Sequence, residues 1–216
     1  MGGVTTQDAY VSSLSQTEAQ IRAFLAQGEH ATAATLLLRT YSDELLGYLV
    51  NGLRDRELAR EAFALFARDM WLALPKLQLQ SSARAWAYAL ARNASRRLLD
   101  RAVRKHRQEL PVSQADSAAM GAVETRASTP PYLRTENKTR VAALRERLSF
   151  EEQELLTLRI DRAFEWRDIA AVLSPEDEVG SAAARHRKRF QLVKRKLGKL
   201  LHAGPEPRPD SSDQNV

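Results

Sequence analysis

The sequence contains no cysteine, and glycine and proline are scarce, with nine and eight among 216 residues. Without cysteine the chain has no disulfide, no thiolate nucleophile and no cysteine-ligated zinc or iron–sulfur site. The glycine and proline content excludes collagen-like and low-complexity chains. No hydrophobic run approaches the roughly 18 residues of a membrane-spanning helix, so we expect a soluble, cytoplasmic protein without membrane contact.

Motifs that carry common enzyme chemistry are also absent from the sequence. The chain has no GxGxxG dinucleotide fingerprint, no phosphate-binding P-loop and no GxSxG nucleophile elbow. Its histidines are far apart, and none forms a ligand pair of the HExxH type: His30, His106, His186 and His202. We therefore predict that the protein is not an enzyme and that it binds neither a metal nor a cofactor.

Positive charge exceeds negative charge and is concentrated in two short segments. Lys and Arg number 33 against 27 Asp and Glu, which gives a net charge of +6 and a pI of about 9.8. Residues 84–107 hold eight Lys or Arg and one acid, Asp100, whereas residues 185–199 hold eight and no acid. A single basic helix is often only a solvated face, but two such segments favour an anionic partner such as DNA.

Helical periodicity covers most of the chain, which is almost free of the alternation typical of strands. The sequence therefore predicts an all-α fold. A central stretch rich in proline and small polar residues has too little apolar content for a core and separates two helical domains. We expect a flexible start at Met1–Thr6 and helices from about residue 5. We divide the chain into an N-terminal extension (1–28), a first domain (29–107), a linker (108–139), a second domain (140–202) and a disordered tail (203–216).

Local signals place the helices of the first domain. Asp55 can accept hydrogen bonds from the free amides that open a helix, and apolar residues then recur at helical spacing up to Pro75. After a polar loop, a long helix is predicted to start at Ser82, with its basic residues on the outer side. The aromatic side chains of these helices are expected in the core: Trp71, Trp86 and Tyr88.

The second domain carries the pattern of a helix-turn-helix. Ser149 and Glu152 have the spacing of a capping box, which predicts a helix start. A short helix around residues 166–173 follows, and a turn separates it from a long helix over residues 181–201. The long helix has an apolar stripe on one side and cations on the other, so it is suited to enter the major groove of DNA.

Short motifs occur in two blocks at characteristic spacing. They are YSDELL at 41–46, RDRELA at 54–59, MWLALP at 70–75, RAWAY at 84–88, LARN at 90–93, LTLR at 156–159, FEWRDIA at 164–170 and VGS at 179–181. In order and spacing these blocks resemble regions 2 and 4 of the extracytoplasmic-function class of bacterial sigma factors. The resemblance implies a promoter-specificity subunit of RNA polymerase that recognises the minus-35 and minus-10 elements and helps to open the promoter.

The resemblance also implies partners and contact residues. The partners would be core RNA polymerase, promoter DNA and, as a further candidate, an anti-sigma factor. The minus-35 contacts would be Ser181, Ala184, Arg185, Arg187, Lys188, Gln191 and Arg195. The minus-10 contacts would be Gln80, Ser81, Ser82, Arg84, Asn93, Arg96, Arg97 and Arg101. Core polymerase would be bound by Glu61, Ala64, Leu65 and Arg68.

At the polymerase contact the family's Asp-x-x-Gln-Glu run reads Glu61, Ala64 and Leu65, which predicts a more apolar contact. Two other functions stay open. A helix-turn-helix repressor or activator would act without core polymerase, although it has no need of a second basic helix. A helical adaptor would bind neither DNA nor polymerase.

Overall fold

The structure is a computed structural model that describes residues 6–109 and 143–202. Within these ranges there is no strand, so the predicted all-α fold is confirmed. The elements are α1 (Thr6–Ala26), α2 (His30–Leu53), α3 (Arg56–Ala73), the 3-10 turn η1 (Leu74–Lys76), α4 (Ala83–Glu109), α6 (Phe150–Leu156), the π-helical turn η5 (Thr157–Asp161), α7 (Trp166–Leu173) and α8 (Val179–His202). The predicted linker, apart from residues 108 and 109 of α4, lies outside the described residues, as does the predicted tail.

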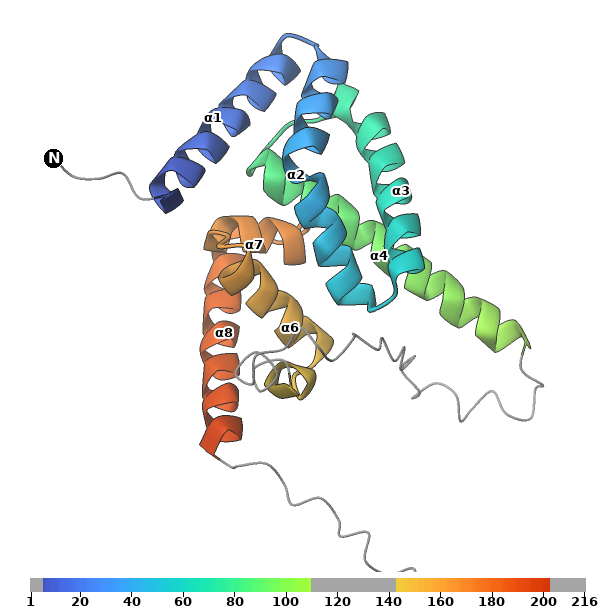
Figure 1. Cartoon of the computed structure of the whole chain (residues 1–216), viewed down its shortest axis with the longest axis vertical. Helices are drawn as coiled ribbons and strands as arrows, with labels where there is room; N and C mark the ends of the chain where they lie inside the picture. Colours follow the sequence, from blue (N-terminus) through green and yellow to red (C-terminus); the bar gives the residue numbers. More distant parts are fainter. Residues whose placement is uncertain (1–5, 110–142, 203–216) are drawn as a thin grey trace, which may run out of the picture.

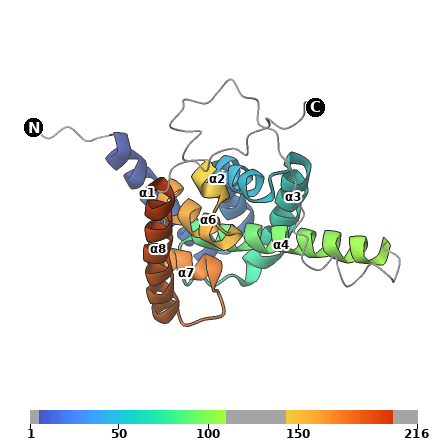
Figure 2. The ribbon, with the colours of Figure 1, turned by 90° about the horizontal axis from the view of Figure 1, so that it is seen from below.

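The long helix α4 connects the other helices. Helices α2 and α3 pack against each other and against α4, and α1 contacts both α2 and α4 (Figure 1). Helix α7 lies between α4 and α8, and α6 also contacts α8. Both views show α3 and α8 on opposite sides of the body, and the C-terminal end of α4 extends beyond the other helices (Figures 1 and 2). None of the described helices combines the length and apolar character needed to cross a membrane.

Two helix starts that the sequence predicts are confirmed. Asp55 caps α3, since its carboxylate accepts hydrogen bonds from the amides of Glu57 and Leu58 at 2.8 and 3.0 Å. Ser149 and Glu152 form the expected capping box at the start of α6. Both devices act over two or three residues, which is why the sequence alone is enough to locate them.

Of two other helix starts, one differs from the prediction and one agrees with it. Helix α8 begins at Val179 instead of Ser181, because the Glu178 carboxylate accepts hydrogen bonds from the amides of Gly180 and Ser181 at 2.8 and 2.7 Å. These bonds hold the pKa of Glu178 below its usual value. At the other end of the chain, α1 begins at Thr6, where the expected flexible start ends.

One hydrophobic cluster draws its buried residues from both predicted domains. Near its centre, the ring of Tyr88 lies 4.9 Å from the ring of Tyr48 and 4.9 Å from that of Phe164, measured between centroids. Tyr88 is thus in the core as predicted and Trp86 is half-buried, whereas the prediction is wrong for Trp71, which is 55% exposed. The two helical blocks share a core in this structure.

Candidate nucleic-acid interface

Helices α7 and α8 pack against each other on the two sides of a turn, at the place where the sequence predicts a helix-turn-helix. Their crossing is built from small buried side chains: Ala170, Ala182 and Ala183. The rings of Trp166 and Phe190 pack edge to face beside it, with centroids 5.5 Å apart. The turn is fastened by a hydrogen bond of 3.0 Å between Ser174 Oγ and His186 Nε2. These contacts on both sides of the turn therefore fix the orientation of α8 relative to α7.

The solvent-exposed side of α8 carries the predicted minus-35 residues. Every member of this set is exposed: Ser181, Ala184, Arg185, Arg187, Lys188, Gln191 and Arg195. The buried side chains of the helix, such as Phe190 and Val193, occupy the opposite face. The outward orientation of the set is confirmed, while its contact with DNA stays a prediction.

The cations on this face differ in how they are held. Arg185 forms an ion pair with Asp177 in the turn, and both side chains are about half exposed. The guanidinium of Arg187 lies over an aromatic ring of α7. Among the described residues, Lys188 and Arg195 have no acidic partner. An anionic ligand could therefore reach Lys188 and Arg195 without breaking an ion pair, whereas at Arg185 it would have to displace Asp177.

The predicted minus-10 residues fall into two groups. Those at the loop tip and on the outer side of α4 are exposed: Gln80, Asn93, Arg96, Arg97 and Arg101. Ser81, Ser82 and Arg84, around the start of α4, are only partly exposed. Arg97 also forms an ion pair with Asp69 of α3. The exposed members therefore outline one basic face along the middle of α4.

Arg84 lies on the opposite side of α4 from this basic face. Its Nε and Nη2 atoms donate to the two carboxylate oxygens of Glu44 at 2.7 and 2.9 Å, and Nη1 donates to the carbonyl of Arg162 at 2.9 Å. Asn93 lies nine positions after Arg84, and at 100° per residue the two side chains point in opposite directions. The expectation that the basic residues of this helix lie on its outer side is wrong for Arg84.

Arg92 is buried more fully than Arg84, in an ion pair that joins α4 to α6, so the expected outer position is wrong for Arg92 too. Its Nε atom lies 2.8 Å from Glu154 Oε1, and the two side chains are 8% and 4% exposed. The hydroxyl of Tyr48 donates to the same oxygen at 2.6 Å. Burial and the neighbouring Glu154 carboxylate raise the pKa of Tyr48 well above its usual value, so the hydroxyl stays a donor.

Sequence reasoning missed this cluster because its members are 62 and 106 residues apart along the chain. The sequence does indicate that Glu154 is buried, because it lies four residues before Leu158 on the same helical face. Leu158 is fully buried. An acid on the apolar side of a helix needs a buried partner, but its identity depends on how distant segments meet.

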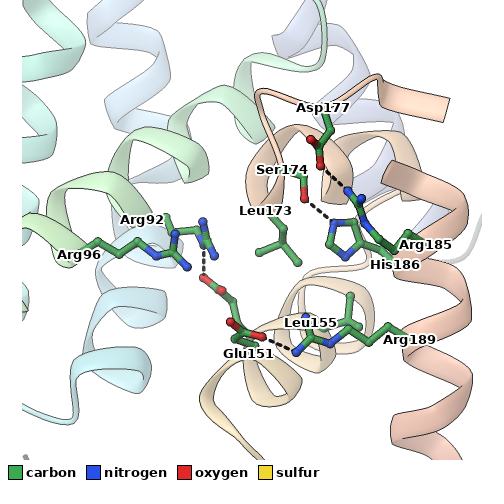
Figure 3. A pocket seen from close by; sticks show the side chains of 11 residues that line it. Arg92, Arg96, Glu151, Leu155, Leu173, Ser174, Asp177, Arg185, His186 and Arg189 are labelled. Carbon is green, nitrogen blue, oxygen red and sulfur yellow. Dashed lines mark hydrogen bonds and ion pairs between the residues drawn. The ribbon is translucent and has the colours of Figure 1, made fainter. Parts of the chain in front are cut away.

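A pocket of about 260 Å³ lies beside the buried pair, between α4, α6 and α8 (Figure 3). Arg92 and Arg96 line it from α4, and Arg185 and Arg189 line it from α8. Glu151 of α6 forms an ion pair with Arg189, which holds the pKa of the Glu151 carboxyl below its usual value. Charged side chains of the two helical blocks thus face each other across a small space.

The exposed side of α3 carries the predicted polymerase-binding residues. Three of them are exposed: Glu61, Ala64 and Arg68. Leu65 is partly buried and packs against the hydrophobic cluster. One turn further along, Trp71 and Leu72 are 55% and 67% exposed and extend this surface with apolar side chains. Exposed large apolar groups next to polar ones are typical of protein-binding surfaces.

Comparison with known proteins does not assign the chain to a family. A scan against models of protein families and a search of curated proteins each found no match. In the parts of the chain that the structure describes, no three His, Asp or Glu side chains gather into a cluster that could hold a metal ion. The exposed surfaces of α3, α4 and α8, together with the sequence motifs, are the features that point to a function.

Proposed function

We propose that this protein is a promoter-specificity subunit of bacterial RNA polymerase. In this role it binds core polymerase, recognises the minus-35 and minus-10 elements and helps to open the promoter. The observation that carries the proposal is the exposed basic face of α8 within a helix-turn-helix. The sequence motifs at 41–93 and 156–181 resemble sigma regions 2 and 4. They favour promoter DNA as the ligand over DNA in general.

A second basic surface favours this function over simple DNA binding. Asn93, Arg96 and Arg97 are exposed on α4, in the other helical block from α8. A protein that contacts one promoter at two separated elements needs two such surfaces, one on each block. The exposed side of α3 then supplies a surface for core polymerase that lies on neither DNA-binding helix.

On a promoter the two blocks would have to separate. Elements at minus-35 and minus-10 lie 25 base pairs apart, which at 3.4 Å per base pair is about 85 Å. In the structure α4 and α8 line the same pocket, so α4 cannot contact the minus-10 element while α8 contacts the minus-35 element. The 33 residues from 110 to 142 could span about 110 Å at full extension, which is enough for this separation.

A helix-turn-helix repressor or activator that acts without polymerase is the second candidate. The observation in its favour is the shared hydrophobic cluster, since a single packed unit is what a small DNA-binding protein needs. The two candidates differ in one respect that can be measured, namely whether promoter binding requires core polymerase.

Binding assays with purified core polymerase separate the two functions. We expect the protein to bind core polymerase and to select promoter fragments only in its presence. Ala64→Glu and Leu65→Glu should weaken core binding by about 1–3 kcal/mol through a desolvated charge, with a thermal melt to check folding. Leu192→Glu, at an exposed leucine of α8, is the matched control and should leave core binding unchanged. Sequence-specific binding to duplex DNA without any affinity for core polymerase would instead establish the second candidate.

A further inference from the structure

Helix α1, for which the sequence suggests no role, is fastened to the loop that precedes α4. The Arg22 guanidinium donates hydrogen bonds to two carbonyls of this loop, those of Leu79 and Ser81. The residue between them, Gln80, is exposed. Arg22 therefore holds the backbone on both sides of Gln80 while leaving that side chain in solvent.

Glu18, one turn before Arg22 on α1, caps α4 from outside. Its carboxylate oxygens accept hydrogen bonds from the amides of Ala83 and Arg84 at 2.7 and 2.8 Å. These amides belong to the first turn of α4, where no carbonyl of the same helix can accept from them. A carboxylate at this place also meets the positive end of the helix dipole. Glu18 thus fixes the start of α4 together with Ser82, whose hydroxyl accepts from the amide of Ala85 at 3.0 Å.

The Glu18 carboxylate is itself held in position. Tyr41 of α2 donates its hydroxyl to Glu18 Oε1 at 3.0 Å, and burial and the Glu18 charge raise the pKa of Tyr41 so that it stays a donor. Around it, Leu14, Ile21 and Leu25 pack α1 onto the hydrophobic cluster, and Ile21 is fully buried. Helix α1 is therefore a rigid support for the loop.

We propose that Glu18 and Arg22 are positioning residues for promoter opening. By fixing the 77–82 loop and the first turn of α4, they present Gln80 and the neighbouring serines to the melted minus-10 strand. This role rests on the proposed function. It also persists when the blocks separate, because α1, the loop and α4 precede residue 110, whereas the contact of Ser82 N with Asp168 Oδ1, at 3.3 Å, crosses to α7 and is lost.

The contact itself can be tested without polymerase. In Glu18→Gln, an amide nitrogen replaces one acceptor, so a donor faces one of the two amides that the carboxylate satisfies. Hydrogen exchange at Ala83 and Arg84 should then become at least about tenfold faster. Glu29→Gln, at an exposed glutamate that makes no side-chain cap, is the matched control and should leave exchange unchanged. Unchanged exchange in Glu18→Gln would overturn the assignment of Glu18 as a cap.

The positioning role is tested with the polymerase complex. Two variants are used, Glu18→Gln and Arg22→Ala, the second of which removes an exposed side chain. In each variant, the affinity for a single-stranded minus-10 oligonucleotide and the rate of promoter opening should fall about tenfold. Core binding, duplex minus-35 binding and the thermal melt should match those of the unsubstituted protein, which a general loss of structure would not allow. If the unsubstituted protein opens no promoter, the proposed function fails. If it does and both variants open promoters equally well, only the positioning role is wrong.

Discussion

Replacing Glu154 with methionine should destabilise the protein strongly, because the buried Glu154–Arg92 pair is one of the contacts that join its two helical blocks. The substitution keeps the length of the side chain but removes the carboxylate. It leaves the Arg92 guanidinium, 8% exposed, without its charge partner and the Tyr48 hydroxyl without its acceptor. Removing one member of a buried ion pair typically costs about 3–5 kcal/mol, because the remaining charge stays desolvated.

Chemical denaturation of a double-mutant cycle measures this cost. Glu154→Met and Arg92→Met should each lower the free energy of unfolding by about 3 kcal/mol or more. The double variant should be more stable than the sum of the two losses predicts, by about 1–3 kcal/mol, since no uncompensated charge is left. Glu154→Gln keeps an acceptor for Tyr48 and should fall between the wild-type protein and Glu154→Met.

The exposed Glu146 provides a control, because Glu146→Met should change the free energy of unfolding by no more than about 0.5 kcal/mol. If Glu154→Met lowers the free energy of unfolding by less than about 0.5 kcal/mol, or if the two losses in the cycle are strictly additive, Glu154 and Arg92 do not form a stabilising ion pair. Either result would mean that α6 does not dock on α4 through this pair.

Three further predictions concern α8. Asp177→Asn should raise affinity for duplex DNA by about two- to tenfold, because it frees Arg185 and removes a charge that repels phosphates; unchanged affinity in a titration would place Arg185 away from DNA. Lys188→Ala should weaken binding to all promoters alike and lower the slope of log affinity against log salt by about 1, whereas a changed base preference would contradict a phosphate contact. Burial and the nearby Arg185 and Arg189 lower the pKa of His186 below 6.5, so the unfolded chain takes up a proton first as the pH falls. The free energy of unfolding should therefore decrease from pH 7 to pH 5 by at most about 1.4 kcal/mol per pH unit. Chemical denaturation of His186→Gln should show a smaller decrease, and an equal decrease in the variant would contradict this role of His186.

The features that could be predicted from the sequence are those set by neighbouring residues. The caps at Asp55 and Ser149 depend on two or three adjacent positions, and the outward face of α8 depends on helical geometry alone. Arg84 could have been assigned correctly from the same geometry, since the nine steps to Asn93 turn a helix through two and a half revolutions and place the two side chains on opposite sides.

Contacts between distant segments could not be predicted in this way. Glu18 stands on the apolar side of α1 among Leu14, Ile21 and Leu25, which hints at a buried acceptor. The sequence alone does not reveal that the donors are amides 65 and 66 residues away. The same holds for Glu154, whose partners belong to other helices, so packing decides what each buried acid does.

Run-off transcription with purified core polymerase tests the central proposal most directly. Core enzyme is mixed with the protein and a library of genomic fragments, with core alone and a known sigma factor as controls. We expect initiation at defined start points, with transcripts that depend on the protein and diminish in Lys188→Ala at low protein concentration. No transcription above the level of core alone, while the control sigma factor is active, would contradict the proposal.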